Sequence, residues 1–142
     1  HDITRKYNAI VWNPFSVESG TVDAPLARSR KDRKKVAIDQ SGRRAVTHYR
    51  VLKNFKQFAH VECQLETGRT HQIRVHMSSI GHPLLGDDVY GSGKSPYNIT
   101  GQALHARVLG FVHPRTGKYM EFEAPLPDYF QKILNDLESN GR

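Results

Sequence analysis

A short stretch, residues 65–76, gathers side chains that could do chemistry. It reads Leu-Glu-Thr-Gly-Arg-Thr-His-Gln-Ile-Arg-Val-His. Arg69 and Arg74 can each bind a carboxylate or a phosphate through two parallel hydrogen bonds, which a lysine cannot do. Backbone N–H groups at the start of a helix would add further donors for an anion. The stretch therefore predicts an anion pocket, and an ordinary structural ion pair is the alternative.

Arg74 carries a more specific expectation. It follows Ile73, so it lies at the margin of the apolar face of a helix expected here. A half-buried guanidinium is costly unless an acidic group faces it. We therefore expect Arg74 to have a fixed acidic partner.

Other chemistries fit the sequence poorly. His71 and His76 are five residues apart, which misses the four-residue spacing of a zinc-binding helix, and no Cys-x-x-Cys pair exists. We therefore expect no metal. The Gly-Ser-Gly-Lys-Ser run at 91–95 lacks the first glycine of a phosphate-binding loop, because Asp88 stands in that place. Cys63 alternates with polar residues and is expected to be a small buried side chain.

The elements around residues 65–76 are predicted from periodicity. Alternating apolar and polar residues, or runs of β-branched and aromatic ones, predict strands at 6–12, 45–55, 58–65, 107–112 and 118–124. The spacing of Ile73, Met77 and Ile80 predicts a helix over 70–80. Residues 16–25 are expected to form a loop because they are rich in Ser, Gly and Pro.

A second helix is predicted after Asp128. Its buried face is expected to consist of Phe130, Ile133, Leu134 and Leu137. The resulting order of elements predicts an α+β fold, with a largely antiparallel or mixed β-sheet and flanking helices. The length of the chain, 142 residues, suits a single domain.

The positive charge is concentrated in one region. Lys and Arg total 21 against 14 Asp and Glu. Six of these cations fall within eight positions, namely Arg28, Arg30, Lys31, Arg33, Lys34 and Lys35. Such a run repels itself unless solvent or a polyanion surrounds it, so nucleic acid, through its phosphates, is a candidate partner of these six residues. A solvated basic loop without a partner is the alternative.

Composition also bears on the compartment. No apolar run approaches the ~20 residues that span a bilayer, so no membrane association is expected. Cys63 is the lone cysteine, which excludes an internal disulfide and fits a reducing, cytoplasmic compartment.

Several motifs together resemble the RluA-like pseudouridine synthases, most closely the type called pseudouridine synthase D, which acts on the large ribosomal RNA. The central motif is residues 65–77, followed by Gly-His-Pro-Leu-Leu-Gly-Asp-Asp-Val-Tyr-Gly at 81–91. The segments at 3–9, 20–26, 45–49, 104–106 and 123–127 also resemble family signatures. The motifs occur in the family's order along almost the whole chain.

The resemblance implies an enzyme that isomerises uridine to pseudouridine in RNA without a cofactor or metal, with ribosomal RNA as the expected target. It assigns catalytic roles to Tyr7, against the uracil, and to Arg74, which pairs with the nucleophilic Asp. It places Arg69, Ile73 and Leu104 at the substrate. The target base must leave its stack to enter such a site.

The sequence departs from the family in one respect. The family's nucleophile lies in an Arg-Leu-Asp motif upstream of the segment that residues 3–9 match, and this motif is absent here. We therefore interpret residues 1–142 as the C-terminal portion of the catalytic domain. We expect this fragment to be inactive alone and to self-associate through an exposed sheet edge.

Two other functions remain open from the sequence. The chain could be a non-catalytic RNA-binding module that keeps the fold and the basic run. Alternatively, its charge could be incidental and the domain could serve as a protein-interaction scaffold.

Overall fold

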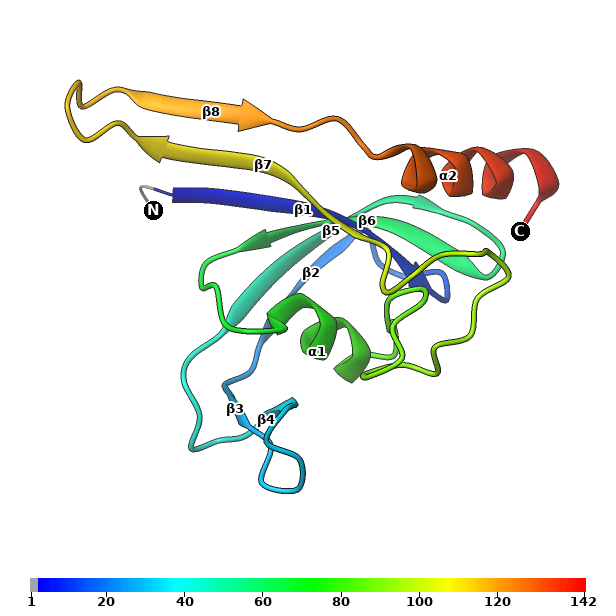
Figure 1. Ribbon diagram of the computed structural model, residues 1–142, viewed down its shortest axis with the longest axis horizontal. Helices are drawn as coiled ribbons and strands as arrows, with labels where there is room; N and C mark the ends of the chain where they lie inside the picture. Colours follow the sequence, from blue (N-terminus) through cyan, green and yellow to red (C-terminus); the bar gives the residue numbers. More distant parts are fainter. Residues whose placement is uncertain (1–2) are drawn as a thin grey trace.

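The computed structural model describes residues 3–142, which form a six-stranded antiparallel sheet with the strand order β2-β5-β6-β1-β7-β8 (Figure 1). The strands are β1 (Ile3–Trp12), β2 (Ser19–Asp23), β5 (Val46–Asn54), β6 (Phe58–Leu65), β7 (Leu104–Val112) and β8 (Tyr119–Glu123). A separate hairpin joins β3 (Leu26–Arg28) to β4 (Val36–Ile38). The predicted α+β class is confirmed, with every pairing in the sheet antiparallel.

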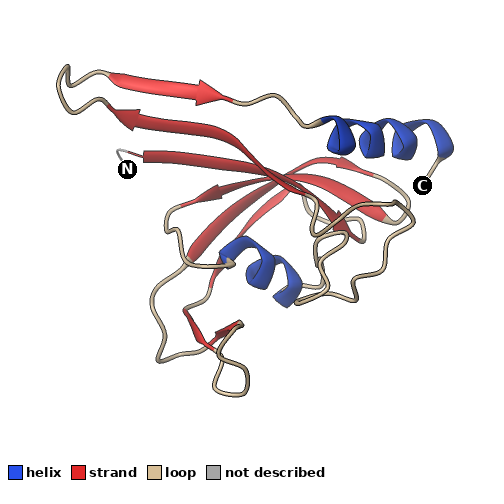
Figure 2. Ribbon diagram, in the orientation of Figure 1, coloured by secondary structure: helices blue, strands red, loops and turns tan. Residues whose placement is uncertain are grey.

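Two helices pack on opposite faces of the sheet (Figure 2). Helix α1 (Gln72–Ser79) packs through Ile73 and Met77 against alternate residues of β1 and β6, among them Ala9 and Val61. Helix α2 (Asp128–Asn140) packs through its apolar stripe against the other face. Neither helix in residues 3–142 has the length and apolar character needed to cross a membrane.

The loop predicted at residues 16–25 is wrong for Ser19–Asp23, which form β2. This strand lies at the edge of the sheet and buries only Val22, so its composition shows little of the apolar alternation of an inner strand. Gly20 makes room for the Tyr49 ring where β2 meets β5: a Cβ there would lie 2.4 Å from the Tyr49 hydroxyl, so that side chain would have to move.

The helix predicted over 70–80 is shorter at both ends. His71 precedes α1 with a left-handed backbone (φ 56°), so the helix begins at Gln72. The sequence predicts that Ile80 completes the buried stripe, but this residue follows the helix and is exposed. Of the stripe predicted on α2, Phe130, Ile133 and Leu137 are buried and Leu134 is half-buried.

Neither helix packs on the end of the sheet formed by β8, the start of β1 and the end of β7 (Figure 1). In Figure 1, β8 and the adjoining ends of β1 and β7 project away from the helices as an arm. Residues that pair across neighbouring strands of the arm have their side chains on the same face of the sheet. One face of the arm therefore carries the apolar side chains of Ile3, Leu109, Phe111, Met120 and Phe122. Most of these side chains are exposed. We call this surface the apolar arm face.

His60 lies on the opposite face, under α2. Its Nε2 donates to Oδ1 of Asn8 (2.6 Å), and its ring packs edge-on against Phe130. Burial and the nearby charge of Arg107 lower the pKa of His60 to about 4. The neutral imidazole is therefore the form that the fold accommodates.

This burial predicts a pH-dependent stability. The unfolded chain binds a proton at His60 near pH 6.5, whereas the folded chain resists protonation until about pH 4. The free energy of unfolding should thus fall as the pH is lowered from 6.5 towards 4. Denaturant unfolding across this range checks it, with His60→Gln as the comparison because glutamine also offers a donor to Asn8. The variant should show a flatter dependence, and an unchanged slope would contradict this assignment.

Candidate active site

The residues singled out by their resemblance to a known family converge on one pocket of about 210 Å³. The pocket lies between the start of α1 and the adjacent faces of β1, β6 and β7. It is lined by Tyr7, Leu65, Arg69, His71, Gln72, Ile73, Arg74, Gln102 and Leu104. All five proposed catalytic and substrate residues (Tyr7, Arg69, Ile73, Arg74 and Leu104) are among them. We call this cavity the central pocket.

Strand alternation brings Tyr7 and Leu104 into the central pocket. Tyr7 lies two residues before the buried Ala9, so it points to the same face of β1 as the packing against α1. Leu104 is opposite Ala9 on β7 and packs against the same cluster. The pairing of β1 with β7 shifts between Lys6 and Tyr7, and an irregularity of this kind re-aims side chains beside it.

Arg74 enters the pocket with one edge of its guanidinium already bound. Its Nε donates to Oδ2 of Asp87 (2.8 Å) and its Nη2 to Oδ1 (3.0 Å). The Arg74 side chain is only 12% exposed and that of Asp87 is fully buried. The expected acidic partner of Arg74 therefore exists within this chain.

The family resemblance implies that the acidic partner of Arg74 is a nucleophilic Asp upstream of residues 3–9. This expectation needs correction, because at the Nε edge of the guanidinium the partner is Asp87. Asp87 already occupies Nε and Nη2, and the structure shows no hydrogen bond to Nη1 among residues 3–142. Nη1 and the second N–H of Nη2 are thus the donors of Arg74 that are left for a second anion.

Asp87 itself is fully engaged. Its Oδ1 also accepts from the backbone N–H groups of Val89 and Tyr90, both at 3.0 Å. Burial acts to raise the pKa of Asp87, but the guanidinium of Arg74 and these two N–H groups hold the pKa below its usual range. Asp87 does not line the central pocket, and its contacts fix the orientation of the Arg74 side chain.

A second network fixes the turn before α1. The side-chain carbonyl of Gln72 accepts from the hydroxyl of Thr67 (2.7 Å) and the N–H of Arg69 (3.1 Å). Its amide donates to the carbonyl of Val46 and the hydroxyl of Thr47. Gln72 is buried, and it therefore holds the 67–69 turn against β5.

Tyr90 connects this site to the β3–β4 hairpin. Its hydroxyl accepts from the N–H of Val36 (2.9 Å) and can donate to Nδ1 of His71 (2.7 Å). The ring also lies 5.1 Å from the guanidinium carbon of Arg74. Burial and the charge of Arg74 lower the pKa of His71, which keeps this imidazole neutral.

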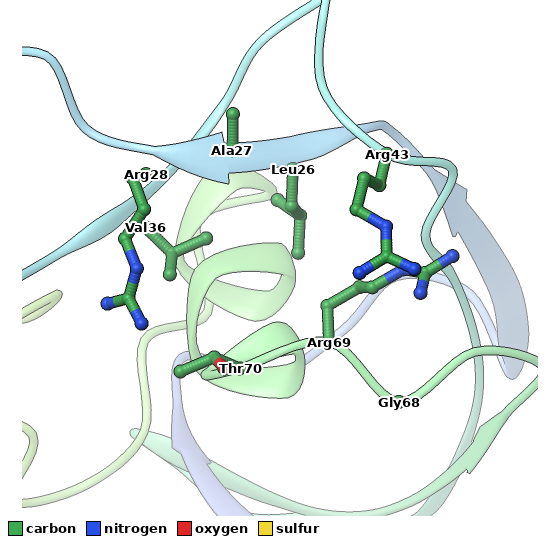
Figure 3. A pocket seen from close by; sticks show the side chains of 8 residues that line it. All are labelled: Leu26, Ala27, Arg28, Val36, Arg43, Gly68, Arg69 and Thr70. Atoms are coloured by element: carbon green, nitrogen blue, oxygen red, sulfur yellow. The ribbon is translucent and has the colours of Figure 1, made fainter.

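The six residues of the basic run lie apart from the central pocket. All six are exposed, and most of them occupy the turn between β3 and β4. Arg28 alone among them reaches a second cavity of about 320 Å³, which we call the arginine pocket (Figure 3). It is lined by Leu26, Ala27, Arg28, Val36, Arg43, Gly68, Arg69 and Thr70.

Several residues of these sites carry little signal in the sequence. Asp87 is visible there only as part of a Gly-Asp-x-x-Tyr-Gly stretch, and Arg43 only as one more cation. His71, Gln72 and Gln102 also line the central pocket. Within residues 3–142, no group of three or more His, Cys, Asp or Glu side chains is placed to hold a metal ion.

Comparison with known sequences identifies the family of this chain. Residues 1–79 match the family described as RNA pseudouridylate synthase. An uncharacterized RNA pseudouridine synthase of Bacillus subtilis is 55% identical over 139 residues, which are 98% of this chain and 46% of the relative. The ribosomal large subunit pseudouridine synthase D of Zymomonas mobilis is 50% identical, over 100% of this chain and 47% of the relative. The chain thus spans about half the length of these relatives.

Solved structures show the same fold. Human RNA Pseudouridylate Synthase Domain Containing 4 superposes with a TM-score of 0.75 at 27% identity, over 96% of this chain and 62% of the human one. Human RNA Pseudouridylate Synthase Domain Containing 1 gives a TM-score of 0.76 at 23% identity, over 97% and 66%. On its sequence match and its fold, this chain belongs to the RNA pseudouridylate synthase family.

Proposed function

We propose that the protein containing this chain isomerises uridine to pseudouridine in RNA, and that the central pocket receives the uracil. The observation that carries this proposal is the convergence of Tyr7, Ile73 and Arg74 on one pocket. Its volume of about 210 Å³ is below the ~300 Å³ at which pockets for drug-sized ligands begin, which suits a single pyrimidine.

The proposed reaction is a rearrangement that needs no cofactor. The bond from uracil N1 to ribose C1′ breaks, the base turns, and C5 bonds to C1′. The proton leaves C5 and N1 gains one, so that no atom is lost or added. Tyr7 would lie against the uracil and assist the proton transfer. Ile73 and Leu104 would pack on the base. Arg69 would form one wall of the central pocket.

In this proposal Arg74 orients and ionises the nucleophile. A carboxylate that meets Nη1 of Arg74 would be favoured in its charged form by the adjacent guanidinium. No Asp or Glu of residues 3–142 lines the central pocket. The carboxylate must therefore come from a part of the protein outside these residues, so that residues 1–142 would be the C-terminal portion of the catalytic domain.

Ribosomal RNA is the substrate that we favour, because several relatives bear the name ribosomal large subunit pseudouridine synthase D. The six exposed cations of the basic run would meet its phosphates. A cytoplasmic location is consistent with this substrate and with the single, buried Cys63.

The isolated chain is expected to be inactive. Without a carboxylate at Arg74 it can bind a uridine but cannot attack C1′. Release of tritium from RNA labelled at C5 of uridine measures turnover, with the whole protein as the positive control. Turnover by residues 1–142 alone would show that the nucleophile has been misplaced.

In the whole protein, catalysis and RNA binding should be separable. Arg74→Lys keeps a charge opposite Asp87 but loses the forked geometry, so turnover should fall by at least about a hundredfold with little change in RNA affinity. Arg74→Ala should be more severe, but it leaves Asp87 buried and unpaired at a cost of about 3–5 kcal/mol of stability. Thermal unfolding of both variants therefore accompanies the assay.

Joint replacement of Arg30, Lys31 and Arg33 by alanine is the matched comparison. This variant should bind RNA more weakly, with a salt dependence reduced by up to about three phosphate contacts, and should keep its turnover at saturating RNA. Equal losses of binding and turnover in both sets of variants would contradict the proposed division.

We also propose that the isolated chain self-associates through the apolar arm face and the adjoining edge strand β8. Phe122 is 52% exposed and Leu109 48% exposed, and they lie opposite each other on neighbouring strands. β8 has an unpaired edge, which can add a further strand. Both features favour contact with a second copy.

Sedimentation of the isolated chain over a range of concentrations tests this association. The wild-type chain should form dimers or larger species, and Phe122→Glu should shift the equilibrium towards monomer. Glu123→Gln, a change on the neighbouring and opposite-facing residue of β8, serves as the control. A wild-type chain that stays monomeric at high concentration would rule out the association.

A further inference from the structure

We propose that the arginine pocket binds a phosphodiester group of the same RNA strand whose uridine enters the central pocket. This inference rests on the proposed function for the identity of the ligand. The pocket itself is defined independently, by three arginine side chains around one cavity of about 320 Å³.

The shape of the pocket suits a sugar–phosphate segment. Figure 3 shows Leu26 and Val36 pointing into the cavity between Arg28 on one side and the guanidinium groups of Arg43 and Arg69 on the other. Leu26 and Val36 are buried and form an apolar floor. A phosphate could therefore meet the guanidinium groups while its ribose covers the floor.

The charge of the pocket is uncompensated in residues 3–142. No ion pair joins Arg28, Arg43 or Arg69 to an Asp or Glu in this part of the chain. The nearby carboxylate of Glu66 is engaged by Arg44 and His48. Three like charges around one cavity repel one another, and an anion between them would replace this repulsion by attraction.

The backbone holds these arginines in place. Arg43 exchanges two hydrogen bonds with Leu26, each 2.9 Å long, so its Cα is fixed beside β3. Gly42 permits this close approach, because a Cβ there would lie 2.5 Å from the carbonyl oxygen of Leu26. Arg69 donates through Nε to the carbonyl of Arg44 (2.9 Å), which leaves its two terminal nitrogens for a ligand.

The side chain of Arg69 lines both the arginine pocket and the central pocket, so the two pockets are adjacent. A phosphate held by Arg43 and Arg69 would thus lie next to the nucleotide in the central pocket. Its role would be to fix the position of the strand beside the extruded base, whereas the exposed cations at the tip of the hairpin supply general attraction.

Inorganic phosphate is the first probe, because it tests the pocket without reference to the reaction. Titration of the whole protein, followed by the backbone amide resonances, should shift Gly68, Arg69 and Thr70 and then saturate. Arg43→Ala should weaken this binding about tenfold, as expected for the loss of one charged hydrogen-bonding group. Arg115→Ala, which removes an exposed arginine at the far β7–β8 turn, should leave it unchanged. Equal binding by wild type and Arg43→Ala, or no saturable shift, would overturn the proposal.

Uridine, uridine 3′-monophosphate and uridine 5′-monophosphate are the second probes. They separate this inference from the proposed function. At least one monophosphate should bind more tightly than uridine, and this advantage should vanish in Arg43→Ala. If uridine shifts Tyr7 and Ile73 but a phosphate adds nothing, the arginine pocket is refuted and the proposed function stands. If phosphate saturates the pocket but uridine leaves Tyr7 and Ile73 unmoved, the anion site stands and the proposed function fails.

Discussion

The fork between Arg74 and Asp87 is the constraint on which the central pocket depends. It joins α1 to the segment after it through two hydrogen bonds of 2.8 and 3.0 Å, with the carboxylate fully buried. Desolvating two charges is expensive, and such a pair is poor evidence of stabilisation by itself. What it supplies is orientation. With Nε and Nη2 held, the plane of the guanidinium is fixed and Nη1 is directed to one place.

Much of this arrangement could be predicted from the sequence, because local patterns encode it. Strict alternation along β6 and the apolar spacing within α1 reflect one-sided burial, so strand and helix follow from residue order alone. The same alternation places Tyr7 on the face of β1 that packs against α1. Convergence of Tyr7, Arg69, Ile73, Arg74 and Leu104, however, followed only from resemblance to a family, since no local pattern brings residues 7, 74 and 104 together.

The failures concern features that the pattern of apolar and polar residues does not encode, namely strand pairing and the geometry of turns. β2 is a strand because β5 offers it a pairing edge, although its own composition favours a loop. Asp87 is the partner of Arg74 because the turn at Val89 and Tyr90 directs its carboxylate inward. Ile80 has an apolar side chain at the right spacing, but the helix ends before it. Only the first of these outcomes was decided by residues distant in sequence. The other two were decided by local turns, whose geometry the apolar pattern does not encode.

The side chains of residues 3–142 that line the two pockets carry positive charge and no negative charge. Neither pocket is lined by an Asp or Glu of residues 3–142, while four arginines face one cavity or the other. The acidic groups nearby, Asp87 and Glu66, are engaged as partners of Arg74 and of Arg44. The surface is therefore built to receive negative charge from outside itself. In the proposals made above, a phosphate would bind Arg43 and Arg69, and a carboxylate would bind Nη1 of Arg74. In the proposed function, the positive field around the two pockets would attract the RNA strand and would also favour an ionised carboxylate at Arg74. The exposed cations of the basic run would contribute to RNA binding alone, which is why the two activities can be separated by mutation.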